Sequence, residues 1–216
     1  MHTLNKNAYV LAICLSVLAG CVDAIGFLSL GGYFISFMSG NSTRLAVNLA
    51  TGDLHAALFV AAILVTFVLG TMVGVFVRHF SKPSLAVANV LAMITLLLAA
   101  AATSHEMGWG VLATGCMTLA MGAENAVLQR GGEVVVGVTY MTGTLVKIGQ
   151  RLANALLGGD ALAWAPYLLL WLGLISGGVI GTLLFYVLGL HGLWVAALWA
   201  AILTVVAVWS QHRLAI

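Results

Sequence analysis

The chain has 216 residues, of which 62% are hydrophobic and only 6% are charged. Soluble domains carry about a quarter charged residues, so this composition excludes a soluble globular protein. A formal net charge of +2 without any basic cluster also excludes nucleic acid as a partner. The lipid bilayer is the expected partner.

The hydrophobic residues gather in six long runs, separated by the few charged residues. Each run reaches or approaches the roughly 20 residues that a helix needs to cross the hydrocarbon core of a bilayer. Together they predict an all-α polytopic membrane protein with a single membrane domain over residues 1–216. The runs begin at Ala8, Ala56, Ser84, Trp109, Ala161 and Gly192.

An internal repeat divides the chain into halves of about 8–103 and 107–212. Sequence similarity at a fixed offset indicates a duplicated structural unit. The matching residues are Gly20, Asp23 and Ala24 with Gly122, Asn125 and Ala126 (offset 102); Met38, Ser39, Gly40, Asn41 and Arg44 with Met141, Thr142, Gly143, Thr144 and Lys147 (offset 103); and Gly70 and Gly74 with Gly177 and Gly181 (offset 107).

Each half is expected to begin with one helix, over about 8–30 and 107–128, and to end with two more. Between them lies a polar, glycine-rich segment, 31–50 or 131–155. If both polar segments cross the membrane, each half has four crossings and the halves are parallel. If both re-enter on the side from which they came, each half has three crossings and the halves are inverted.

The loop charges favour the re-entrant arrangement, because it places every loop cation on one side, as the positive-inside rule requires. We therefore expect about six transmembrane helices plus two re-entrant or broken segments, in two inverted repeats. A seven-span variant, in which only the second polar segment crosses, would misplace Arg213 alone and stays open. The cations are Lys6, Arg78, Lys82, Arg130 and Arg213; Asp53, His55, Glu106 and His191 would face outward.

Each polar segment is expected to contain the start of a short helix. The extended stretches Tyr33 to Phe37 and Glu133 to Tyr140 lead into Ser, Thr and Asn residues, which cap helix N-termini. The free N–H groups and the dipole of such an end attract anions. Arg44 and Lys147, one turn further on, add positive charge. The predicted substrate-binding residues are Ser39, Gly40, Asn41, Arg44, Thr142, Gly143, Thr144 and Lys147.

Ionisable residues at membrane depth cost on the order of 2.5 to 3.5 kcal/mol each, so they need partners or a polar cavity. In one interpretation, Asp23 pairs with Arg44 and Glu124 pairs with Lys147. In another, these cations and Arg151 leave one positive charge for a bound anion, unless Arg151 reaches the interface. Asp23 or Glu124 could also carry a coupling proton. The predicted coupling or ion-pair residues are Asp23, Glu124, Asn125 and Arg151.

Glycines spaced four residues apart lie on one helix face and let backbones approach closely. We expect them to pack the two halves against each other rather than to form a dimer interface. They are Gly70 and Gly74, and Gly173, Gly177 and Gly181.

No metal site and no cofactor are predicted. The three cysteines lie in apolar runs without paired spacing, and the histidines lie mainly near the ends of segments. The sequence lacks the H-E-x-x-H zinc motif and the G-x-S-x-G nucleophile motif, so we do not expect an enzyme.

These motifs resemble those of the YoaK family of uncharacterised bacterial membrane proteins, a domain-of-unknown-function family, over nearly the whole chain. The resemblance implies a bacterial inner-membrane protein with about six spans and no established activity. The positive-inside rule places both termini in the cytoplasm. A shorter stretch, residues 39–52, is similar to the segment of SulP-type anion permeases in which a strand meets a half-helix that holds the anion. In those permeases the strand and half-helix cross the membrane together, which conflicts with a re-entrant assignment.

The leading functional hypothesis is a small secondary transporter or channel for a small, anionic solute, with its site at the bilayer midplane. The alternative is a non-transporting membrane assembly or regulatory protein, in which the buried charges are only structural. An intramembrane enzyme is the weaker third hypothesis. The sequence leaves self-association into a homo-oligomer open.

Overall fold

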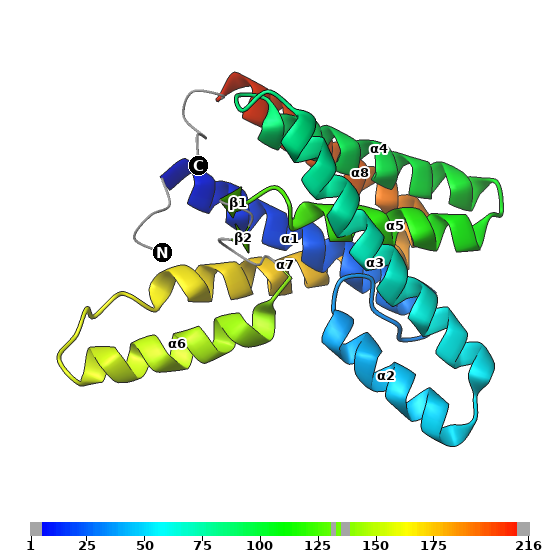
Figure 1. Ribbon diagram of the computed structural model, residues 1–216, viewed down its shortest axis with the longest axis horizontal. Helices are drawn as coiled ribbons and strands as arrows, with labels where there is room; N and C mark the ends of the chain where they lie inside the picture. Colours follow the sequence, from blue (N-terminus) through cyan, green and yellow to red (C-terminus); the bar gives the residue numbers. More distant parts are fainter. Residues whose placement is uncertain (1–5, 131–132, 135–138, 211–216) are drawn as a thin grey trace.

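The structure is a computed structural model that describes residues 6–130, 133–134 and 139–210. It is almost entirely helical (Figure 1). The elements are α1 (Lys6–Ser29), α2 (Met38–Thr51), α3 (Leu54–Phe80), α4 (Ala86–Glu106), α5 (Gly110–Glu124), β1 (Gln129–Arg130), β2 (Glu133–Val134), α6 (Met141–Leu156), α7 (Ala165–Leu188), a 3-10 turn (Gly189–His191) and α8 (Gly192–Trp209).

Four stretches of helix in the described part of the chain are long and apolar enough to cross a membrane. Three of them are α1, α3 and α4, and the fourth is the continuous stretch Ala165–Trp209, which contains α7 and α8. The polytopic class predicted from composition is therefore confirmed. Helix α5 has only 15 residues and ends at Glu124, before the predicted boundary at residue 128. It is shorter than the roughly 20 residues of a full span.

The first polar segment contains a short helix, as predicted. Gly31 and Gly32, with φ of 65° and 97°, turn the chain after α1 in a conformation that favours glycine. An extended stretch then leads to α2, which has 14 residues and packs against α3. Gly52, with φ 78°, ends α2, and the side chain of Asp53 starts α3 by accepting the Ala56 N–H at 3.0 Å. The two helices are thus antiparallel neighbours (Figure 1).

The second polar segment has the same plan, with a short helix, α6, that packs against α7. A small hairpin, in which Gln129 pairs with Val134 and Arg130 pairs with Glu133, lies between α5 and α6. Half of the predicted extended stretch Glu133 to Tyr140, residues 135–138, lies outside the described residues. In Figure 1, α2 and α6 each begin near the middle of the molecule and run outward in different directions.

The glycine stripes lie where helices of different halves pack on each other. A Cβ on Gly177 would overlap the carbonyl of Val17 in α1, and a Cβ on Gly70 would overlap the carbonyl of Leu119 in α5. Gly181 and Gly74 meet the backbones of Cys21 and Ala123 in the same way. The prediction that these glycines pack the halves together is confirmed, because α1 lies on α7 and α5 lies on α3.

The core fills the centre of the bundle, where α4 packs on α5 and on α8, and α1 contacts α8. Most of its largest fully buried side chains come from α1, α4, α5 and α8, and they include Leu15, Leu18, Leu91, Ile94, Met117 and Leu193. By contrast, α2 and α6 contribute few buried residues. The short helices therefore stand outside the core, and their buried polar residues are Asn41 in α2 and Thr144 in α6.

Candidate functional site

The two short helices begin without a side-chain cap. Phe37 precedes α2 and Tyr140 precedes α6, and neither makes a side-chain capping hydrogen bond. The predicted caps are therefore wrong by position, because Ser39 and Thr142 lie inside the first helical turn. We call residues 35–40 the first mouth and residues 139–143 the second mouth.

The polar side chains of the first turns are engaged with their own helices. Ser42 and Thr43 donate to the carbonyls of Met38 (2.9 Å) and Ser39 (3.2 Å), four residues back. Thr144, in α6, donates to the carbonyl of Tyr140 at 3.3 Å. In each of these bonds, the hydroxyl donates its proton to a backbone carbonyl one turn earlier. The N–H groups of Ser39, Gly40, Thr142 and Gly143 make no hydrogen bond with the residues that the structure describes.

In the first mouth, a carboxylate from α1 holds the extended stretch. Asp23 Oδ1 accepts the N–H groups of Ile35 and Ser36, both at 2.7 Å. The fully buried Asn41 continues this arrangement, since its side chain accepts from the Phe34 N–H at 3.1 Å and donates to the Phe34 carbonyl at 2.7 Å. Asp23 and Asn41 therefore both hold this extended stretch through hydrogen bonds to its backbone.

The predicted ion pair between Asp23 and Arg44 does not form. The Asp23 carboxylate is bound by backbone N–H groups, and the Arg44 guanidinium lies over the ring of Tyr33, 5.0 Å from its centroid. Cation–π contacts of this kind are worth about 0.5 to 2 kcal/mol. Each charge at the first mouth has thus found a partner other than the opposite charge.

The second mouth has a carboxamide where the first has a carboxylate. Asn125 Oδ1 accepts the Thr139 hydroxyl at 3.0 Å, and its Nδ2 donates to the carbonyl of Met121 at 3.1 Å. Thr139 matches Ser36 in the repeat, so the same two positions meet in both halves. Lys147 lies over the ring of Tyr167, with Nζ 5.6 Å from the centroid.

Glu124 is 1% exposed, and neither carboxyl oxygen has a hydrogen-bond partner among the residues described. The predicted pair with Lys147 is therefore also wrong, because the lysine is on Tyr167 instead. Burying an ionised carboxylate without partners costs several kcal/mol, so the charged form of Glu124 is unfavourable at this position.

A polar cleft of about 550 Å³ runs along α6 beside the start of α7. Two cationic side chains line it, and no acidic side chain does. Arg151, predicted as a coupling or ion-pair residue, lies in this cleft. The lining residues are Lys147, Gln150, Arg151, Ala153, Asn154 and Tyr167.

A second cleft, of about 590 Å³, lies between α1 and α7. Its lining is mainly apolar, and Asp23 is its only ionisable residue. Phe27 and Phe34, whose ring centroids are 4.9 Å apart, both line this cleft.

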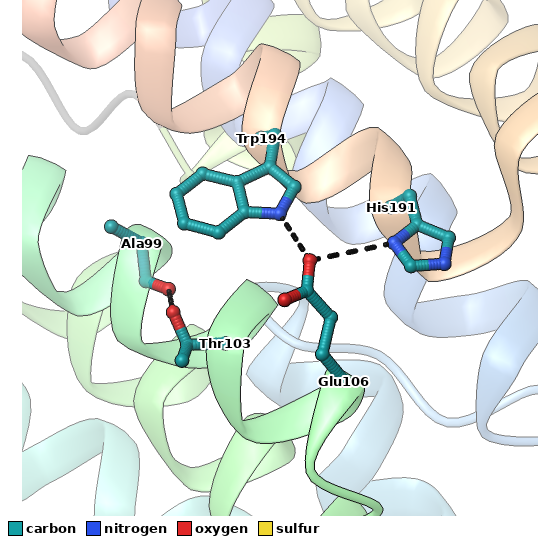
Figure 2. Close-up of polar contacts among 5 residues, drawn as sticks. All are labelled: Ala99, Thr103, Glu106, His191 and Trp194. Carbon is teal, nitrogen blue, oxygen red and sulfur yellow. Dashed lines mark hydrogen bonds and ion pairs between the residues drawn. The ribbon is translucent and has the colours of Figure 1, made fainter.

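A separate polar cluster joins α4 to α8 at one end of the bundle (Figure 2). Glu106 Oε1 accepts the Trp194 indole N–H at 2.8 Å and lies 3.7 Å from His191 Nδ1. His105 and His191 stack edge to face at 5.5 Å. Sequence reasoning placed Glu106 and His191 in outward loops and missed their contact. Among the described residues, no three His, Cys, Asp or Glu side chains form a metal-binding group.

Sequence reasoning also missed Arg78 as a structural residue. Its guanidinium, at the end of α3, donates to the carbonyls of Val127 and Gln129, both at 2.9 Å. The first half thereby holds the turn that follows α5 in the second half. No repeat signal pointed to this contact, because the matching position in α7 is apolar.

Residues 11–206 match the family model described as protein of unknown function (DUF1275). A relative, the UPF0700 transmembrane protein RA0705 of Rhizobium meliloti (strain 1021), is 38% identical over 203 residues, which cover 94% of this chain and 87% of the relative. Neither description names a catalytic activity. No solved structure matches the chain.

Proposed function

We propose that this chain, which belongs to the DUF1275 family of membrane proteins, is a small secondary transporter or channel for a small anionic solute. The solute would bind at the first turns of α2 and α6. The family membership agrees with the uncharacterised membrane protein family expected from the motifs.

The observation that carries the proposal is the pair of uncapped short helices. Both begin near the middle of the molecule without a side-chain cap, and both carry a cation two turns or less from their start, Arg44 or Lys147. Helix N-termini attract anions through free N–H groups and the helix dipole. The cationic cleft along α6 supports an anion in particular, since no acidic residue lines it.

The arrangement of the halves supports a transport cycle. The contacts of Gly177 with Val17 and of Gly70 with Leu119 occupy matching positions in the repeat. Small residues at these matching interfaces let the helices of the two halves approach closely, and the proposed cycle moves the halves relative to each other along these contacts. We propose that the halves are inverted, that the short segments are re-entrant or broken, and that the protein lies in a bacterial inner membrane with both termini cytoplasmic.

Glu124 is the candidate for a coupling group. It is buried and has no partner among the residues described, whereas Asp23 is bound by the backbone of the first mouth. A membrane-depth carboxyl that can gain and lose a proton is a common element of proton-coupled transporters.

The test is uptake of labelled small anions into proteoliposomes. The double variant Arg44→Gln/Lys147→Gln should lose uptake while it inserts and stays monodisperse. The control, Lys6→Gln/Lys82→Gln, removes two exposed cations elsewhere and should transport normally. Normal uptake by the Arg44/Lys147 variant would refute the proposed site, and absence of uptake by the unmodified protein for every anion class would refute the function.

A further inference from the structure

The polar cleft beside α6 extends well past the start of that helix. We call it the α6 cleft; as described above, its volume is about 550 Å³, and Lys147, Arg151 and Tyr167 are among the residues that line it. Arg151 follows Met141, the first residue of α6, by about 15 Å along the helix axis, at 1.5 Å per residue. In Figure 1, α6 runs outward from the bundle beside α7, so the α6 cleft continues away from the second mouth.

The polar side chains of the α6 cleft are available to a ligand. Gln150, Arg151 and Asn154 are exposed, and their side chains make no hydrogen bond or ion pair with the residues that the structure describes. Lys147 lies over the uncharged ring of Tyr167, with Nζ 5.6 Å from the centroid. A guanidinium presents a planar set of N–H donors that suits phosphate oxygens, and an ammonium adds a point charge. The α6 cleft therefore offers two cations and two carboxamides to an oxyanion.

No acidic group of the lining offsets these cations. Of the residues around the α6 cleft, none is Asp or Glu. Asp160, the acid that follows α6 in the chain, accepts the Leu162 N–H at 3.0 Å in the turn before α7. The buried Glu124 belongs to α5 and is not a lining residue. The α6 cleft thus carries two positive charges, which favour an anionic ligand over a neutral or zwitterionic one.

The depth of Arg151 matches the level of lipid headgroups. The hydrocarbon core of a bilayer is about 30 Å thick, so its edge lies about 15 Å from the midplane. If α6 begins at the midplane, as in the proposed function, Arg151 reaches that edge. The other side of α6 is apolar and exposed, with Leu145, Leu152 and Leu156 spaced along it. A phospholipid can use both the cations and these leucines, whereas a soluble phosphate can use only the cations.

We propose that the α6 cleft binds an anionic phospholipid, with its phosphate at Lys147 and Arg151 and its acyl chains against the exposed leucines of α6. The depth assignment rests on the proposed function, but lipid binding itself does not require transport. Phosphatidylglycerol has the required net negative charge. Phosphatidylcholine has the same phosphate, but its ammonium group would meet no acid in the α6 cleft. The expected selectivity is therefore for the charge of the headgroup.

Native mass spectrometry of the delipidated full chain tests this selectivity. Titration with phosphatidylglycerol and with phosphatidylcholine of the same acyl chains gives the dissociation constant of the first bound lipid. A cation beside anionic lipid contributes about 1 kcal/mol, or about fivefold in affinity, so two cations should favour phosphatidylglycerol by about 25-fold. Arg151→Gln should reduce this preference about fivefold. Gln150→Glu, which places an acid in the α6 cleft, should reduce it by a similar factor, and Arg151→Lys should largely retain it.

The control is Lys82→Gln, which removes a cation from the exposed turn between α3 and α4 and should keep the preference. Thermal unfolding without lipid identifies a variant that fails to fold, and the other cleft variant then decides. Equal affinity of the unmodified protein for both lipids would overturn the inference. An unchanged preference in a folded Arg151→Gln or Gln150→Glu variant would also overturn it.

Two further measurements separate the lipid from other anions. Inorganic phosphate, added at the concentration of phosphatidylglycerol that saturates the first site, should not displace the lipid; displacement would assign the α6 cleft to free phosphate and overturn the lipid assignment. Uptake of labelled small anions into proteoliposomes tests the proposed function independently. Lipid preference without uptake would support this inference and refute transport, and uptake without lipid preference would do the reverse.

Discussion

The two halves of the chain place different side chains beside the start of their short helices. In the first, Asp23 accepts the backbone N–H groups ahead of α2, so the polar segment is satisfied by its own chain. In the second, Asn125 bonds to a hydroxyl, and the adjacent Glu124 has no partner among the described residues. The carboxyl group thus lies one position further back along the helix in the second half, and there it has no hydrogen-bond partner among the described residues.

The scaffold around these mouths, by contrast, is closely matched. Gly20 approaches the backbone of Leu174 and Gly178, and Gly122 approaches that of Phe67 and Thr71. These positions are related by the same offsets as the sequence repeat. The comparison teaches that the packing between the halves follows the sequence repeat closely, whereas the side chains beside the two short helices do not.

The largest expected effect is on the matched scaffold. Gly177→Ala and Gly70→Ala would each push a methyl group into a backbone carbonyl of the opposing helix. Overpacking costs typically 1 to 3 kcal/mol, and we expect about 3 kcal/mol at both sites, since a backbone cannot yield as a side chain can. Thermal unfolding in detergent measures the loss.

The control for this pair is Gly115→Ala, in α5, where an added Cβ meets nothing within 4 Å. It should stabilise the helix by up to about 1 kcal/mol, the difference in helix propensity. Similar losses in Gly177→Ala and Gly70→Ala would sharpen the equivalence of the halves. A loss at only one of the two would show that the interfaces are not equivalent.

A smaller effect is expected where the mouths differ. Glu124→Gln keeps the shape of the buried side chain, but the carboxamide cannot gain and lose a proton as the carboxyl group can. If Glu124 couples transport to protons, uptake driven by a pH gradient should fall about tenfold or more, equal to about 1.4 kcal/mol, while exchange of solute at equal pH continues. Flux into proteoliposomes, with and without a gradient, measures both.

The matched control is Glu106→Gln, the same substitution at a side chain that is 45% exposed. Its gradient-driven uptake should equal that of the unmodified protein. If Glu124→Gln also transports normally with the gradient, Glu124 is a structural residue and does not couple transport to protons.

Much of the fold follows from the sequence because its causes are local. Long apolar runs determine α1, α3 and α4, and the glycine spacing determines which faces meet. The short helices were also located to within a few residues, since Met38 and Met141 open the repeated motif. The predicted caps are wrong because the helices already begin at Met38 and Met141, so Phe37 and Tyr140 occupy the cap positions.

The ion pairs failed for a related reason. The predicted pairs join opposite charges that lie at similar depth in the sequence, but an extended stretch exposes N–H groups that also bind a carboxylate. Likewise, Tyr33 and Tyr167 offer aromatic faces to Arg44 and Lys147. The sequence does not reveal these partners, because only the folded chain determines which backbone N–H groups and which aromatic rings lie beside each charge.

The smallest expected effect concerns the cluster in which α4 meets α8, helices that occupy matching places in the two halves (Figure 2). Glu106 and His191 are 45% and 58% exposed, so their interaction is screened by solvent. A double-mutant cycle with Glu106→Gln and His191→Gln should give a coupling below about 1 kcal/mol, reduced further by salt. Trp194→Phe removes the shorter contact, at 2.8 Å, and should cost at most a similar amount. A larger coupling would mean that this end of the α4–α8 contact is a fixed joint between the halves, and their relative movement would then have to occur at the α1–α7 and α3–α5 glycine contacts.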